Sequence, residues 1–140
     1  METTYKEIES LTISSDIQNL HQVESLIESV CKEKNVQEEF YGNILIAVTE
    51  AVNNAIQHGN KNNLSKHVFV SASIGKNSLQ FVVKDEGNGF DYNSLPDPTL
   101  PENIDKESGR GIFLMNALSD QVIIENNGTK VILIFDVSND

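Results

Sequence analysis

The chain has few of the residues that an oxidising compartment or a polyanionic partner would require. Its single cysteine, Cys31, cannot form an internal disulfide, so a reducing, cytoplasmic location is expected. Lys and Arg number only 10 against 21 Asp and Glu, which gives a formal net charge of -11. Direct binding of nucleic acid needs clustered Lys and Arg side chains, and binding to an anionic membrane surface needs them too. The composition therefore predicts neither nucleic acid nor membrane as a partner.

Long apolar runs are also missing. Stretches such as Val131–Phe135 are far too short to cross a bilayer, and the opening METTYKEIES lacks the basic and apolar regions of a signal peptide. No repeat or low-complexity tract divides the 140 residues, and 39% of them are hydrophobic, which is enough for one core. A single domain covering residues 1–140 is expected.

Two helices are predicted in the first half of the chain. Ser15 with Gln18 has the spacing of a capping box, and Asn35 with Glu38 repeats it before a second helix that Gly59 ends. The apolar positions that recur at helical spacing are Leu20, Val23, Ile27 and Val30 in the first helix, and Phe40, Ile44, Val48, Ala51 and Ala55 in the second.

Strands surround these helices. Leu11–Ser14 is expected to be a short strand, Val68–Ile74 and Leu79–Asp85 to form a hairpin, and Val122–Glu125 to pair with Thr129–Val137 across an Asn-Asn-Gly turn. Strands and long helices without regular alternation favour an α+β fold. We expect a two-layer α/β sandwich: a mixed, mostly antiparallel sheet with helices on one face.

The strongest functional signal is a pair of segments, EAVNNAIQHG at residues 50–59 and KDEGNGFD at residues 84–91. Glu50 and Asn54 lie four residues apart on the second helix, so they share a face. Asp85 ends a strand on its apolar side, and Gly87 and Gly89 follow it at alternate positions. A carboxylate and an amide facing an acidic, glycine-hinged strand end suit a purine nucleotide and its metal. The alternative is that Glu50 and Asn54 only form a solvated polar face.

Residues 90–108 contain all three prolines and no periodic apolar pattern. Glycine pairs bracket the segment on both sides, so both ends can hinge. A loop of this length is usually a lid, a binding loop or disorder. We expect a lid over the nucleotide site; the alternative is a surface loop without function.

These motifs, taken in order, resemble the GHKL superfamily, whose ATP-binding domain has the Bergerat fold. The resemblance rests on the acid-x-x-x-Asn helix, the Asp-x-Gly-x-Gly strand end, a second glycine box opening a helix, and a late Gly-Thr before a strand. Within the superfamily, GNGFD and SGRGIFLMNALSD are most similar to the anti-sigma-factor serine kinases. The resemblance extends from about the first helix to the C-terminus and so covers nearly the whole chain.

The resemblance implies roles for the residues of the first two motifs. Glu50 corresponds to the general base and Asn54 to the residue that coordinates Mg²⁺. Asp85 would accept a hydrogen bond from the adenine amino group. Gly87 and Gly89 would let the backbone approach the base and the ribose.

The remaining matches concern the phosphates and the late strand. Gly109, Arg110 and Gly111 open a helix whose N-terminal amides form a natural phosphate site. Relatives often carry a basic residue just before this box; here an acidic residue stands there, and the flanking Lys106 and Arg110 are expected to meet the γ-phosphate. Thr129 matches a position near adenine, although a threonine that simply starts a strand is an equal alternative.

Two functions follow from the resemblance. The first is an ATP-dependent protein serine kinase with Mg²⁺ as cofactor, which phosphorylates an anti-sigma-factor antagonist and sequesters a sigma factor when free. The second is a partner-switch module that binds ATP or ADP and sequesters a regulator without phosphoryl transfer. A homodimer is compatible with either.

Overall fold

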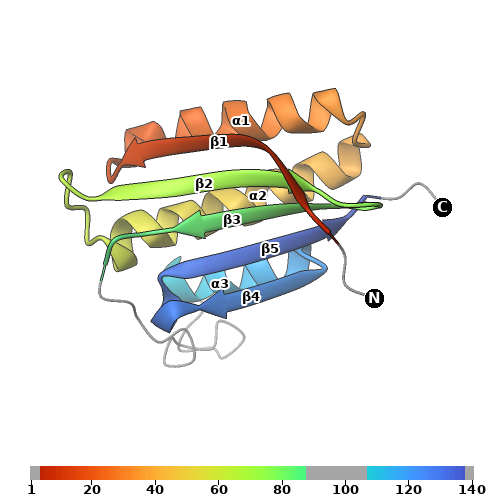
Figure 1. The fold of residues 1–140 in the computed structure, drawn as a ribbon. Coiled ribbons are helices and arrows are strands. Elements are labelled where there is room, and N and C mark those ends of the chain that lie inside the picture. Colours follow the sequence, from red (N-terminus) through yellow and green to blue (C-terminus); the bar gives the residue numbers. More distant parts are fainter. Residues whose placement is uncertain (1–3, 88–106, 138–140) are drawn as a thin grey trace.

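The fold consists of two layers, a twisted sheet and a layer of helices (Figure 1). The computed structural model describes residues 4–87 and 107–137 of the chain. Over these residues it contains five strands and three α-helices, in the order β1, α1, α2, β2, β3, α3, β4, β5. The predicted two-layer α/β architecture is confirmed.

Every neighbouring pair of strands in the described part of the chain is antiparallel. The order across the sheet is β1-β2-β3-β5-β4. The bounds of the strands are β1 Lys6–Ser14, β2 His67–Ile74, β3 Ser78–Lys84, β4 Gln121–Glu125 and β5 Lys130–Asp136. Both predicted hairpins are present, and their strand ends differ from the prediction by at most one residue. β3 occupies the middle of the sheet, so the residue that follows it lies near the centre of the molecule.

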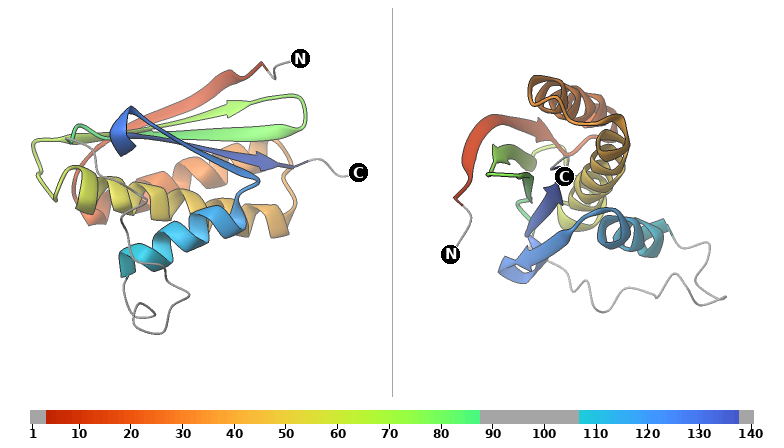
Figure 2. Two further views of the ribbon diagram at one scale, coloured as in Figure 1. Left: turned by 90° about the horizontal axis from the view of Figure 1, so that it is seen from below. Right: turned by 90° about the vertical axis from the view of Figure 1, so that its right-hand side faces the viewer.

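The helices α1 (Leu20–Glu33), α2 (Glu38–Asn54) and α3 (Glu107–Leu118) all cover the same face of the sheet (Figure 2). α2 is the middle helix and contacts α1 on one side and α3 on the other. The surface of α2 that faces the sheet is apolar. Its buried residues there are Ile44, Ala47, Val48, Ala51 and Val52. This central position places the end of α2 beside the end of β3.

The core lies between the two layers. Alternate residues of β3 and β5 point into it, and the rings of Phe81 and Phe135 meet edge to face with their centroids 6.0 Å apart. Cys31 is buried there at 4% exposure, and burial raises the pKa of its thiol to about 11. The thiol is therefore protonated at neutral pH, which agrees with the prediction of a small core residue.

Both predicted capping boxes are wrong. Asp16, not Ser15, accepts the Gln18 amide, and it caps a short 3₁₀ turn that leads into α1. Ser15 is buried and donates its hydroxyl to the Lys66 carbonyl oxygen. Its hydroxyl thus joins two distant segments and takes no part in capping.

Asn35 closes α1 and does not open α2. Its φ is 53°, and the Val36 amide donates to the carbonyl of Cys31 while the Asn35 amide donates to that of Lys32. This hydrogen-bond pattern is the Schellman ending of a helix, for which asparagine is second only to glycine. α2 begins after Gln37, which makes no side-chain cap.

β1 begins five residues earlier than the predicted Leu11, at Lys6. Its pairing with β2 shifts between Glu7 and Glu9, where one residue bulges out of the register. A bulge interrupts the alternation of apolar and polar residues on which the prediction relied. The first half of the strand therefore had no sequence signature.

Candidate functional site

Glu50 and Asn54 lie in the last turns of α2, as predicted. Glu50 is half-buried, and Asn54 is only 2% exposed. The Asn54 Nδ2 atom is buried without a hydrogen-bond partner among the described residues, and so is Oδ1 of the preceding Asn53. Buried polar atoms are nearly always paired, so the unpaired Asn54 Nδ2 marks a position where a ligand or water can complete the hydrogen bonding.

The chemistry of the Asn54 amide fits a nucleotide with its metal. Its nitrogen is a donor suited to a phosphate oxygen, and a half-turn of the amide group presents an oxygen of the kind Mg²⁺ takes as ligand. The described residues contain no cluster of three or more His, Cys, Asp or Glu side chains that would hold a metal by themselves. A metal site here would draw its remaining ligands from phosphate and water.

A π-helical turn, Ala55–Gly59, continues α2 beyond Asn54. Such turns widen the helix and are frequent at functional sites. Here the turn brings Gly59 against the residues that follow β3. A Cβ atom on Gly59 would overlap the carboxylate of Asp85, and one on Gly87 would overlap the carbonyl oxygen of Gly59. The end of α2 and the end of β3 thus meet at backbone distance: the backbone of Gly59 excludes a side chain at Gly87, and a side chain at Gly59 would have to displace the Asp85 carboxylate.

Asp85 faces the helical layer, as its place in the strand alternation predicted. Burial raises the pKa of its carboxyl above the ordinary range, while the Gly87 amide, which donates to Oδ1 at 2.9 Å, and the charge of Lys66 act in the opposite direction. A half-buried carboxylate that keeps an acceptor oxygen toward the helix end is suited to bind a donor such as an exocyclic amino group.

Thr129 is joined to Asp85 through the backbone. The Asp85 amide donates to the Thr129 carbonyl oxygen at 2.9 Å, which connects the residue after β3 to the residue before β5. The Thr129 hydroxyl donates to the carbonyl oxygen of Asn126 at 2.8 Å and so closes its own turn. The hydroxyl of Thr129 therefore stabilises the turn before β5, as expected of a threonine that simply starts a strand. The backbone of the residue still contacts that of Asp85.

The phosphate-binding candidates lie only partly in the described structure. Gly109, Arg110 and Gly111 fall in the first turns of α3, which packs against α2. The helix starts at Glu107, slightly before the glycine box that was expected to open it. Gly89, Lys106 and nearly all of the expected lid at 90–108 lie outside the described residues, and so does the side chain of Arg110.

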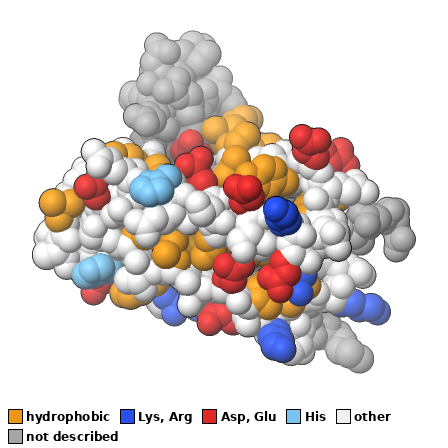
Figure 3. Space-filling model, turned by 90° about the horizontal axis from the view of Figure 1, so that it is seen from above, with side chains coloured by type: hydrophobic (Ala, Val, Ile, Leu, Met, Phe, Trp, Pro, Cys, Tyr) orange, Lys and Arg blue, Asp and Glu red, His pale blue; other side chains and the backbone are white. Residues whose placement is uncertain are grey.

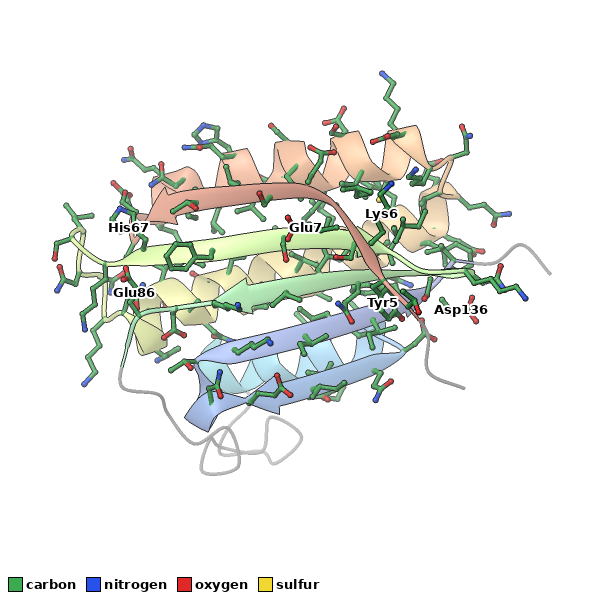
Figure 4. All side chains as sticks on the ribbon, viewed as in Figure 1. Tyr5, Lys6, Glu7, His67, Glu86 and Asp136 are labelled. Atoms are coloured by element: carbon green, nitrogen blue, oxygen red, sulfur yellow. The ribbon has the colours of Figure 1, made fainter. Side chains whose placement is uncertain are left out.

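A residue that sequence reasoning missed stands beside this junction. Asn60 directly follows the π-helical turn, is 2% exposed, and hydrogen-bonds to three other segments. The side chains of His67 and Glu86, with 3.4 Å between Nδ1 and Oε1, lie together at the same end of the sheet (Figure 4). The sequence offered one signal, an asparagine after the helix-ending glycine, but that pattern is also typical of ordinary turns.

The surface agrees with the acidic composition. On the side of the molecule that carries α1 and β1, acidic and hydrophobic side chains are interspersed, and the coloured Lys and Arg side chains form no continuous patch (Figure 3). Within residues 4–87 and 107–137, none of the helices has the combined length and apolar character needed to span a bilayer.

The chain belongs to the family of histidine kinase-like ATPase domains, whose sequence profile matches residues 13–135. This confirms the GHKL-type membership that the motifs predicted. Profile and fold agree, since the match runs from the end of β1 almost to the end of β5.

Among curated proteins, the chain is similar to two proteins named serine-protein kinase RsbW. It is 34% identical over 88 residues to that of Bacillus subtilis (strain 168), which is 59% of this chain and 55% of the relative. With that of Staphylococcus aureus (strain JH9) it is 36% identical over 86 residues, or 56% of this chain and 54% of the relative. The chain spans about half the length of the curated relatives it matches.

A crystal structure of the RsbU and RsbW domains of a Mycobacterium tuberculosis protein has a similar fold. It matches with a TM-score of 0.67 at 18% identity and covers 95% of this chain and 34% of that one. At this identity the likeness concerns the fold. The curated matches thus relate part of the chain to proteins named serine-protein kinases, and the crystal structure shows a shared fold.

Proposed function

We propose that this chain is an ATP-binding protein serine kinase of the anti-sigma-factor type. It transfers the γ-phosphate of ATP to a serine of an antagonist protein, and it sequesters a sigma factor when the antagonist is phosphorylated. The observation that carries the proposal is the junction where Gly59, after α2, meets Asp85 and Gly87, five residues from Asn54, whose buried Nδ2 has no hydrogen-bond partner among the described residues. The naming of its relatives as serine-protein kinases supports the choice of acceptor.

The adenine end of the site is assigned to the turn after β3. Asp85 accepts a hydrogen bond from the adenine amino group, since its carboxylate is half-buried and lies against the helix end. Gly87 and Gly89 leave room for the base and ribose. Thr129 borders the adenine through its backbone bond to Asp85.

The phosphate end is assigned to α2 and the first turn of α3. Asn54 would hold Mg²⁺, which when bound would supply positive charge beside the phosphates during transfer. The amides of Gly109 and Gly111, with Arg110 and Lys106, bind the phosphate oxygens. The packing of α3 against α2 supports the assignment of the phosphate end to these two helices.

Glu50 is assigned as the general base from the family that the chain resembles, and its place on the same helix face as Asn54 fits this role. The serine hydroxyl of the antagonist attacks the γ-phosphorus, the bond from that phosphorus to the β,γ-bridging oxygen breaks, and ADP leaves. The hydroxyl proton passes to the Glu50 carboxylate. Glu50 therefore acts on the acceptor and not on the bound nucleotide.

The second candidate function is a partner-switch module that binds ATP or ADP without transferring phosphate. The site residues serve either function, and the two differ only in whether phosphate reaches a protein serine. A cytoplasmic location suits both, because the lone Cys31 is a buried thiol. A sigma factor and its antagonist remain the proposed partners, and a homodimer is the assembly to test first.

Radiolabelled ATP with a candidate antagonist protein separates the two functions. The kinase assignment predicts labelled serine on the antagonist, normal ATP affinity but no transfer in Glu50→Ala, and loss of both in Asn54→Ala. Wild-type protein that binds ATP but labels no antagonist would favour the binding module. Full transfer by Glu50→Ala would remove Glu50 as the base.

A further inference from the structure

Asn60 makes an unusually complete set of hydrogen bonds for a buried side chain. Its Nδ2 donates to Ser15 Oγ at 2.8 Å and to the His67 carbonyl oxygen at 3.0 Å, and its Oδ1 accepts the Glu86 amide at 2.8 Å. Ser15 directly follows β1, His67 is the first residue of β2, and Glu86 lies in the turn after β3. The side chain thus ties the end of the α2 segment to three other parts of the chain, one of which is the turn that carries Asp85.

The three consecutive amides of that turn each have a fixed acceptor. The Asp85 amide donates to the Thr129 carbonyl oxygen, the Glu86 amide to Asn60, and the Gly87 amide to the Asp85 carboxylate. Only the middle bond links the turn to the α2 segment. It is therefore the hydrogen bond that sets how the turn lies against the helix end.

No other residue type replaces asparagine here without loss. The Ser15 hydroxyl donates its hydrogen to the Lys66 carbonyl oxygen, so toward residue 60 it can only accept. The side chain at this position must therefore donate to Ser15 and to the His67 carbonyl oxygen and accept from the Glu86 amide. A hydrophobic side chain would leave the Glu86 amide and the His67 carbonyl without their bonds to Asn60. An aspartate would keep the acceptor but would lose both donated bonds.

We propose that Asn60 is a positioning residue for the nucleotide site. By holding the Glu86 amide against the end of α2, it places the Asp85 carboxylate where adenine is recognised. This inference rests on the proposed ATP-binding function. It assigns Asn60 no contact with the nucleotide and no part in the chemistry.

The principal test is Asn60→Ala, with nucleotide affinity measured by calorimetry below the unfolding temperature. We expect the Kd for Mg-ATP to rise about 5- to 50-fold, the scale of one lost buried hydrogen bond. The Kd for Mg-GTP should change less, so the preference for ATP should shrink. In the kinase assay, KM for ATP should rise while kcat at saturation stays within about twofold, because Glu50 is untouched.

Ser15→Ala is the matched control. It removes the bonds of Ser15 to Asn60 and Lys66 but leaves the bond from the Glu86 amide to Asn60 in place. Both variants should unfold at a lower temperature, and only Asn60→Ala should lose nucleotide affinity. Equal losses of affinity in the two variants would mean that Asn60 acts through stability alone and would overturn the proposal.

Amide exchange gives a reading without nucleotide. The Glu86 amide should exchange faster in Asn60→Ala than in wild type or Ser15→Ala. If Asn60→Ala does not fold, it is combined with Gly42→Ala, a substitution inside α2 whose Cβ meets nothing within 4 Å and which is expected to add stability. A double variant with the wild-type preference for ATP over GTP and the wild-type exchange rate of the Glu86 amide would contradict the proposal.

The two proposals fail in different ways. Wild-type protein that binds no nucleotide refutes the proposed function and the role of Asn60 together. Wild-type protein that binds ATP, with an Asn60→Ala variant whose Kd and Glu86 exchange are unchanged, refutes the role of Asn60 alone.

Discussion

The ionised carboxylate of Asp85 is unfavourable for the stability of the fold, but the proposed nucleotide site needs it as a hydrogen-bond acceptor. A carboxyl whose pKa is raised in the folded state binds its proton more tightly there than in the unfolded chain. Its contribution to stability is therefore greatest below the unfolded pKa and is lost as the pH rises through the folded pKa. At neutral pH the buried, ionised carboxylate lowers the free energy of unfolding. The proposed recognition of adenine is the reason we give for its presence.

Asp85→Asn should accordingly stabilise the nucleotide-free protein and weaken ATP binding. The amide removes the buried charge and keeps an oxygen for the Gly87 amide, but its nitrogen faces the adenine amino group donor to donor. We expect a higher melting temperature at pH 7, a gain that shrinks as the pH is lowered, and an affinity loss of ~1–3 kcal/mol. Scanning calorimetry and titration across pH measure both.

Glu39→Gln serves as the control for lost negative charge, since Glu39 is exposed in the first turn of α2. It should change neither quantity appreciably. An Asp85→Asn protein that binds ATP as well as wild type would show that Asp85 does not read the base.

At the scale of elements, the contact between the end of α2 and the end of β3 depends on glycine. Gly87→Ala would set a Cβ against the backbone of Gly59, which cannot yield, so we expect a loss of more than ~2 kcal/mol in the free energy of unfolding and no measurable nucleotide binding. Gly59→Ala would meet only the end of the Asp85 side chain. It should cost less stability, and its main effect should be on adenine affinity.

Gly42→Ala is the matched control, because a Cβ there meets nothing within 4 Å and the residue lies inside α2. Helix propensity predicts a gain of about 0.5–1 kcal/mol. Melting temperatures should therefore rank Gly42→Ala above wild type, then Gly59→Ala, then Gly87→Ala. A Gly87→Ala protein as stable as wild type would contradict the close approach of the two elements.

The segment 90–108 remains a prediction of the sequence. If it is a lid, an ATP analogue should protect it from proteases at its glycine-bracketed ends, whereas ADP should protect it less. Limited proteolysis with mass-spectrometric mapping of the cuts checks this. Equal cleavage with and without the analogue would argue for a loop without function.

The elements that were read correctly and those that were missed differ in physical kind. Periodic apolar positions identified α1, α2 and both hairpins, because burial fixes the spacing of those residues. Polar residues such as Ser15 and Asn35 were misassigned, because their partners are decided by the tertiary fold. Asn60 shows the same limit: its partners at Ser15, His67 and Glu86 are distant in sequence, and nothing local distinguishes it from a turn asparagine.

At the scale of the whole molecule, the arrangement explains why one end of the sheet carries the site. β3 is the middle strand and α2 the middle helix, so their adjacent ends lie where both layers can contribute. The sequence predicted this juxtaposition from Glu50, Asn54 and Asp85 alone. It could not predict the π-helical turn that closes the gap, since Ala55–Gly59 has the composition of an ordinary helix end.

Isothermal titration of the wild-type protein with Mg-ATP tests the central claim most directly. The account predicts binding at a single site per chain, with a preference for ATP over GTP that Asp85→Asn abolishes. No detectable heat of binding at millimolar nucleotide, under conditions where the protein is folded, would contradict it.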